Sequence, residues 1–225
     1  MKKTIALMLM VCLLLVGCGQ EAEVTGTPET IPETTAAAEP TQTKNIVYPL
    51  PDTTMENMTD AVLSVSLEEG KAYVDDTGKM QMDLTVYTYD KYDMVDISTL
   101  KAGDTLVTHS GEVEILAVEQ DPSGTVRING GLDEGGMDLV TDDSGIFYET
   151  GYNDHKSWYA IGYATIRVSV DFIFTDNADL EQGEVIYYPG SFLIGEVTNY
   201  DFTPTNTTIR IADGQIVEMN RVYTP

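Results

Sequence analysis

The chain has 225 residues, of which 37 are acidic and 12 basic, and its formal net charge at pH 7 is −25. This acidic excess argues against nucleic-acid binding, which requires Lys and Arg, and against an electrostatic grip on anionic lipid. The acidity is typical of a solvated surface that keeps a monomer soluble, although attraction of cations or basic partners is an alternative interpretation.

The N-terminus has the pattern of a secretory signal. Lys2 and Lys3 precede an unbroken apolar run over residues 5–16. This run suits the hydrophobic region of a signal peptide and is too short to span a bilayer as a helix. It ends in Leu-Val-Gly-Cys at residues 15–18, which resembles the lipobox of bacterial lipoproteins. The resemblance implies that residues 1–17 are cleaved off and that a lipid is attached to Cys18. An ordinary signal peptide with a chance cysteine, or an uncleaved apolar helix, is the alternative.

Lipidation has consequences for thiols and location. The other cysteine, Cys12, lies within the signal region, so the mature chain would have no free thiol and no disulfide. Each buried methylene of an acyl chain contributes about 0.8 kcal/mol, and two or more chains hold a protein stably on a membrane. We therefore expect the protein on the extracytoplasmic face of the cell membrane. Cleavage would also remove two lysines and take the formal charge from −25 to −27.

A compositional change marks the next boundary. Residues 18–45 are rich in Thr, Glu and Pro and almost lack large apolar side chains. Such a segment cannot offset its ordering entropy by burial, so we expect a disordered tether. Residues 46–225 form the globular part, as one domain or as two subdomains. A chain of this size can bury about 70% of its unfolded surface, which is enough for a core without disulfides.

Helix signals are scarce in the globular part. Thr53 and Glu56 have the spacing of a capping box, which predicts one or two helical turns. Alternation of apolar and polar residues predicts strands instead. In chain order, these lie at residues 61–66, 81–89, 105–108, 112–117, 126–129, 137–140, 146–149, 165–174, 184–188, 208–212 and 215–222.

The strand over residues 165–174 has the longest alternation. One face should bury five apolar side chains, namely Ile166, Val168, Val170, Phe172 and Phe174. Asp213-Gly214 between the last two strands is a signal for a two-residue hairpin. Together these patterns predict an all-β fold, an antiparallel sandwich or small barrels with hairpins and minimal helix.

Catalytic residues are not indicated. His109 and His155 are the only imidazoles. Ser110 and a nearby Asp complete a Ser–His–Asp set on paper, but the abundance of acids removes its specificity. Paired carboxylates for glycoside hydrolysis remain open, because such pairs come from distant strands.

Metal ligands are not indicated either. Two distant histidines do not suit zinc, and calcium, which prefers carboxylate oxygens, has only weak support. The acidic loops at residues 142–145 and 176–179 lack EF-hand spacing. Asp, Asn and Gly are also the residues that turns require. We therefore assign no metal ligand and no cofactor.

One loop combines aromatic rings with polar side chains. Residues 148–159 contain the only tryptophan of the chain. Flat rings stack on sugars or peptide groups while polar groups fix their orientation, so this loop is a candidate binding surface. Its proposed ligand-binding residues are Tyr152, Asp154, His155, Trp158 and Tyr159. In the alternative, the aromatic side chains fold back on the sheet.

The lipobox, the Thr/Glu/Pro spacer and the β-rich pattern together resemble uncharacterised acidic lipoproteins of Gram-positive bacteria. This resemblance implies no activity and no site residues. We expect a membrane-anchored monomer that binds a glycan or peptide without catalysis. An envelope-associated hydrolase that uses carboxylates is the alternative.

Overall fold

The structure is a computed structural model that describes residues 43–52, 55–151 and 155–224. The predicted signal peptide, Cys18 and nearly all of the tether lie outside the described residues, as do Thr53, Tyr152 and Asp154. Strand accounts for 48% and helix for 9%, which confirms the all-β prediction with minimal helix. None of the helices in the described part is long and apolar enough to cross a membrane.

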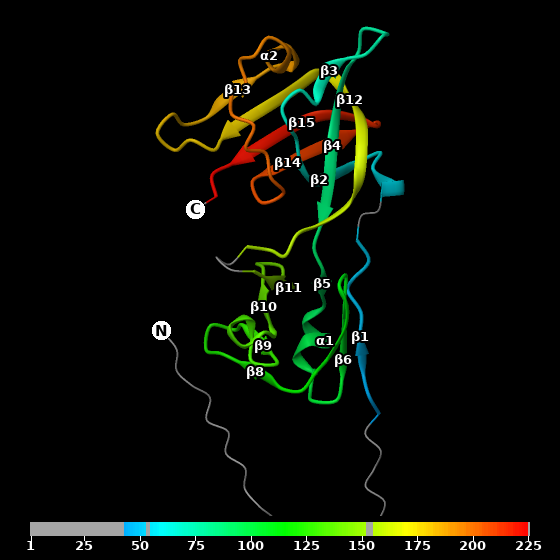
Figure 1. Cartoon of the computed structure of the whole chain (residues 1–225), viewed down its shortest axis with the longest axis vertical. Helices are drawn as coiled ribbons and strands as arrows, with labels where there is room; N and C mark the ends of the chain where they lie inside the picture. The colour runs from blue at the N-terminus through cyan, green and yellow to red at the C-terminus, as the bar shows by residue number, and fades with distance from the viewer. Residues whose placement is uncertain (1–42, 53–54, 152–154, 225) are drawn as a thin grey trace, which may run out of the picture. The chain divides into compact units, whose positions relative to one another are not determined.

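Five strands close into a barrel (Figure 1). In order around it they are β2 (Ala61–Ser66), β4 (Met80–Thr88), β12 (Tyr159–Asn177), β15 (Gln215–Val222) and β14 (Thr207–Ala212). β14 pairs again with β2, and all pairs are antiparallel except β12 with β15. Beside the barrel lie β3 (Ala72–Val74), β13 (Val185–Tyr187) and the short helix α2 (Pro189–Leu193).

Alternation within each strand builds the barrel core. Met82, Leu84 and Val86 on β4 are buried, as their spacing predicts. Phe192 of α2 joins the same core and packs on Phe174 of β12, with ring centroids 5.5 Å apart. The barrel is therefore filled by side chains and covered at one place by α2.

The prediction for Val170 was wrong. Its neighbours in the pattern, such as Ile166 and Phe172, are buried, but Val170 is 83% exposed. β12 pairs with β4 up to Arg167, and its register against β15 shifts between Val168 and Ile173. Such an irregularity breaks the period of two, so one residue of the series faces solvent.

A second group of elements, here called the insert, lies between β4 and β12 in the chain. It contains β5 (Lys91–Tyr92), α1 (Met94–Ser98), β6 (Thr105–Thr108), β7 (Gly111–Glu114), β8 (Val118–Gln120), β9 (Val126–Ile128), the short η2 (Leu132–Glu134), β10 (Met137–Thr141) and β11 (Phe147–Thr150). Its sheets have the orders β5-β11-β10-β9-β8 and β1-β6-β7, where β1 (Ile46–Val47) comes from before the barrel.

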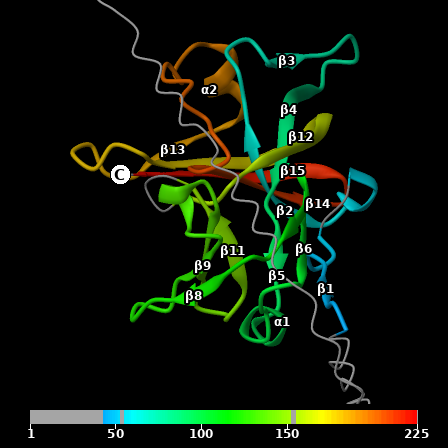
Figure 2. The same cartoon turned by 60° about the horizontal axis from the view of Figure 1, so that its bottom comes forward.

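The insert has its own hydrophobic core. Tyr92, Leu106 and Leu139 are among its fully buried members, and none of them belongs to the barrel cluster. Figures 1 and 2 show the insert strands grouped apart from the barrel strands. The short 3-10 turn η1 (Met55–Asn57) precedes β2, where the capping-box spacing predicted a helical turn.

Candidate functional site

The outer face of β4 and β12 carries polar side chains and one unusual tyrosine. Because Leu84 and the other buried residues of β4 point into the barrel, the alternating residues Asp83 and Thr85 point outward. On β12, Tyr163 lies opposite Thr85, and Thr165 lies opposite Asp83. The two strands thus place these four side chains side by side on the outside of the barrel.

This face is hollowed beside Tyr163. The four side chains and Ser66 line a cavity of about 320 Å³. The side chain of Tyr163 is 84% exposed. Oδ1 of Asp83 accepts hydrogen bonds from the Thr165 hydroxyl at 2.7 Å and from the Tyr73 hydroxyl at 3.2 Å. The desolvation of Tyr73 and its bond to Asp83 raise the pKa of this tyrosine. A flat ring and a carboxylate that is already oriented therefore line the same cavity.

Sequence reasoning missed Tyr163, although a signal was present. Tyr163 lies two positions before Thr165 and four before Arg167, so it is on the same, polar face of the predicted strand. A large aromatic ring on the solvent side of a strand is such a signal. The predicted strand over residues 165–174 began two residues too late to include it.

The structure describes three of the five predicted ligand-binding residues. Trp158 is partly buried and meets the Tyr89 ring edge-on at 4.8 Å. The backbone oxygen of His155 accepts from Gly151 N at 2.7 Å, which closes the loop. Tyr159 is in contact with His109 and Asp90. The role of these residues in binding stays a prediction.

Tyr159 belongs to a cluster where the insert meets the barrel. Its ring stacks on His109 at 4.0 Å, and its hydroxyl donates to Asp90 Oδ1 at 3.1 Å. Asp90 is only 4% exposed, and its Oδ2 accepts from the backbone N–H of His109 at 2.7 Å. Burial and the Asp90 carboxylate raise the pKa of Tyr159 to about 12. These contacts tie the β6–β7 hairpin to the ends of β4 and β12.

The same cluster has the connectivity of a Ser–His–Asp set. His109 Nδ1 lies 3.0 Å from Asp90 Oδ2, and His109 Nε2 lies 3.0 Å from the Ser110 hydroxyl. Ser110 is exposed at the hairpin tip, and its N–H donates to Thr108 Oγ1 at 3.1 Å. An acyl-transfer site needs N–H donors aimed at a developing oxyanion. Because this N–H already donates to an acceptor within the turn, we interpret the three residues as a structural network that stabilises the β6–β7 hairpin.

Glu149 adds a second carboxyl group to this cluster. Desolvation raises its pKa, and the nearby Asp90 charge acts in the same direction. Burial likewise raises the pKa of Tyr92. Perturbed groups gathered in one place are a feature of active sites, although structural networks produce them too.

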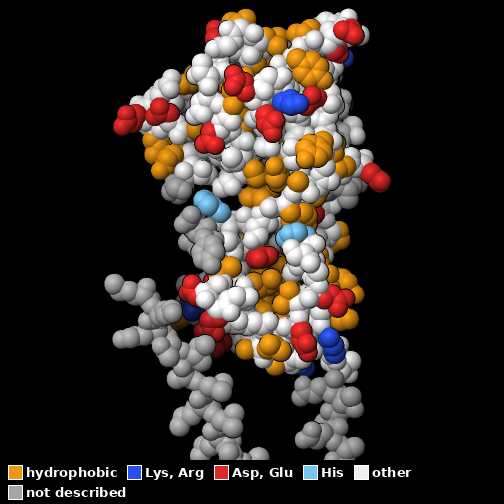
Figure 3. All heavy atoms as spheres, in the orientation of Figure 1, with side chains coloured by type: hydrophobic (Ala, Val, Ile, Leu, Met, Phe, Trp, Pro, Cys, Tyr) orange, Lys and Arg blue, Asp and Glu red, His pale blue; other side chains and the backbone are white. Residues whose placement is uncertain are grey.

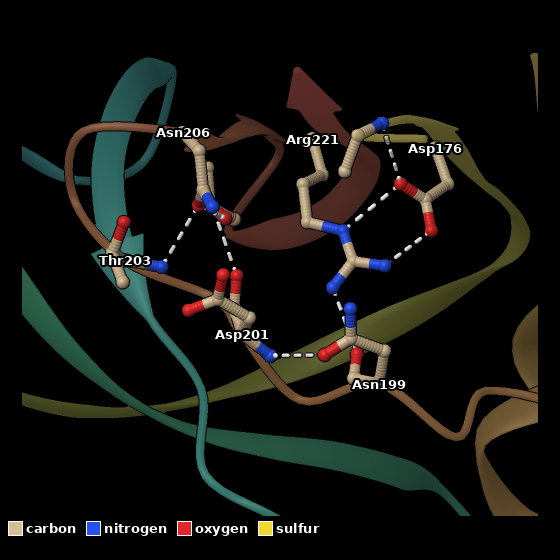
Figure 4. Close-up of polar contacts among 8 residues, drawn as sticks. Asp176, Asn199, Asp201, Thr203, Asn206 and Arg221 are labelled. Carbon is tan, nitrogen blue, oxygen red and sulfur yellow. Dashed lines mark hydrogen bonds and ion pairs between the residues drawn. The ribbon is translucent and has the colours of Figure 1, made fainter. Parts of the chain in front are cut away.

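A cavity of about 530 Å³ is lined in part by a buried arginine, Arg221, whose polar contacts are drawn in Figure 4. Arg221 on β15 is 3% exposed and pairs through Nε (2.9 Å) and Nη2 with both oxygens of Asp176 on β12. Its Nη1 donates to the backbone oxygen of Asn199 at 2.7 Å. The guanidinium also lies 4.5 Å from the Phe202 ring centroid. Because these partners engage all three nitrogens, the arginine fixes the loop around residue 199 to the barrel.

The acidic loops do not form a metal centre in the described part of the chain. No group of three or more His, Cys, Asp or Glu side chains there is placed to hold an ion. Asp142 accepts from Ser144 N at 2.9 Å and Ile146 N at 3.1 Å, so it stabilises its own turn. These bonds lower the pKa of Asp142, with the Ser144 hydroxyl as the largest cause. Figure 3 shows acidic side chains scattered over both halves of the face in view.

Comparison with known proteins gives no relative to guide this assignment. No family model, no curated protein and no solved structure matches the chain.

Proposed function

We propose that this protein is an envelope lipoprotein, anchored through Cys18, whose barrel binds a glycan on the outer face of β4 and β12. The observation that carries the proposal is Tyr163, 84% exposed at the edge of a cavity of about 320 Å³. An exposed ring stacks on the apolar face of a sugar, while Asp83 and the neighbouring hydroxyls accept and donate hydrogen bonds.

Architecture and charge support the same ligand class. OB-type barrels, which are also small five-stranded barrels, bind oligonucleotides or oligosaccharides on the face of their second and third strands. In chain order, the second and third barrel strands here are β4 and β12. This is an argument by analogy of fold. The net charge of −25 disfavours the oligonucleotide and leaves the oligosaccharide.

Titration of the detergent-solubilised chain with cell-wall and neutral glycan fragments tests the proposal. Isothermal calorimetry should detect one glycan class, and Tyr163→Ala should weaken its binding by about 30-fold, the effect of a hot spot worth about 2 kcal/mol. Tyr48→Ala, which removes a 63% exposed tyrosine that does not line this cavity, is the control and should bind normally. Unchanged binding by Tyr163→Ala would refute this site.

Hydrolysis by carboxylates is the second candidate, and Glu149 favours it. A carboxyl group whose pKa is raised by desolvation beside a second carboxylate suits a general acid. The same glycans should then be cut, with new reducing ends that disappear in Glu149→Gln. A binding module would release no reducing ends at any enzyme concentration.

A further inference from the structure

Three aromatic rings surround the ammonium group of Lys156. We call Tyr89, Tyr148 and Trp158 the aromatic box. Nζ of Lys156 lies 4.3 Å from the ring centroid of Tyr89, 5.0 Å from that of Tyr148 and 5.9 Å from that of Trp158. It also donates to the Tyr89 hydroxyl at 3.0 Å. The box therefore already holds an alkylammonium group, supplied by the chain itself.

The three rings pack on one another edge-on, and the ammonium group of Lys156 lies over each of them. Tyr148 and Trp158 stand nearly perpendicular to Tyr89, at 76° and 83°. They come from β11 and from just before β12, whereas Tyr89 directly follows β4. The negative faces of such rings attract a cation. A cavity of about 240 Å³, lined by Tyr89, Trp158 and Lys156, adjoins the box.

The charges around the box favour a bound cation. Lys91 Nζ is 4.8 Å from the Tyr89 ring centroid, but Asp52 pairs with it at 2.9 Å. Asp142 interacts electrostatically with Lys156. The net charge of the chain is also strongly negative, which raises the local concentration of cations.

We infer that the aromatic box is a binding site for a quaternary ammonium group and that Lys156 occupies it as an internal competitor. A lysine ammonium is strongly hydrated in water, which offsets much of the attraction that it gains from a cation–π contact. Aromatic cages recognise quaternary ammonium ligands, which have no N–H groups to keep hydrated. The ligand displaces Lys156, whose side chain turns out to solvent. This site is independent of the glycan surface at Tyr163.

Trp158 is the only tryptophan of the chain, so its fluorescence reports on the box. The full chain is titrated with tetramethylammonium chloride, against sodium chloride of equal ionic strength and against uncharged tert-butanol. The emission of Trp158 should change saturably with tetramethylammonium alone. Lys156→Met, which keeps an unbranched side chain but removes its charge, should bind at least about 10-fold more tightly, because the tethered ammonium group is gone.

Matched variants make the result decisive. Lys101→Met, at an exposed lysine of the insert, should behave as the unmodified chain. Adding Tyr148→Leu to Lys156→Met should abolish the response. Vesicles of phosphatidylcholine and free choline then distinguish a lipid headgroup from a soluble ligand. The inference is overturned if Lys156→Met shows no saturable response, if it binds no more tightly than the unmodified chain, or if it unfolds by circular dichroism, which would make Lys156 a structural latch.

Discussion

Carboxylates that accept hydrogen bonds in turns and a carboxyl group that is mainly desolvated have opposite effects on the pH dependence of stability. The carboxylates of Asp75, Asp121 and Asp142 accept several hydrogen bonds in their turns, which lowers their pKa values. Each contributes stability above the unfolded pKa of about 3.9, and this contribution is lost as the pH falls through the folded pKa. Glu149 is the opposite case, because desolvation raises its pKa.

Replacing Glu149 by Gln should therefore stabilise the fold at neutral pH. The folded chain holds a proton on Glu149 more readily than the unfolded chain, whose glutamates have a pKa of about 4.3. Acidification from neutral pH through the folded pKa protonates Glu149 in the unmodified chain and so removes the free-energy cost of desolvating its charge. Glu149→Gln has no such charge, so its stability does not change in this way. Denaturant unfolding between pH 7 and 4.5 should show the advantage of the variant shrinking as the pH falls. A difference in unfolding free energy that does not change with pH would contradict the assignment.

Turns between strands depend on backbone conformation more than on contacts. In the β14–β15 hairpin, Asp213 and Gly214 have φ values of 50° and 70°. This geometry suits a type I′ turn, as Asp-Gly predicts. A Cβ at Gly214 would meet nothing within 4 Å, so any cost of a side chain there is conformational.

Gly214→Ala should destabilise the protein by about 1–2 kcal/mol, because an L-residue is strained at positive φ. Gly190 in α2 is the matched control, since it also has open space around its Cβ position but no positive φ. Gly190→Ala should be neutral or slightly stabilising. Urea unfolding at constant m-value measures both variants. Equal effects of the two substitutions would show that φ is not the cause.

At the scale of the whole chain, attachment to the membrane depends on one residue. Cys18→Ala should release the protein from the membrane fraction or leave it as an unprocessed precursor. The unmodified chain should partition into detergent and incorporate labelled fatty acid, because stable anchoring needs two or more acyl chains. Fractionation and metabolic labelling measure this. Normal cleavage without an acyl label on the unmodified chain would refute the lipoprotein assignment.

Much of the local structure was determined by the sequence alone. The period of two located β4, β6, β14 and β15 to within a residue or two, and Asp213-Gly214 predicted the turn between the last two. These features depend on neighbours in the chain, which is why a linear pattern reveals them. The all-β class and the scarcity of helix follow from the same local preferences.

Only the tertiary structure decided which strands pair and which side chains meet. The parallel pairing of β12 with β15, the exposure of Val170 and the bond between Arg221 and Asp176 join residues far apart in sequence or depend on a register shift. The candidate sites are of the same kind, since Tyr163 lies opposite Thr85, 78 positions earlier, and Lys156 reaches Tyr89, 67 positions earlier. The sequence singled out the loop over residues 148–159 by its aromatic residues. It did not predict that Lys156 would occupy the aromatic box. A sequence specifies side-chain chemistry and local period, whereas closure of the barrel selects the neighbours of each side chain.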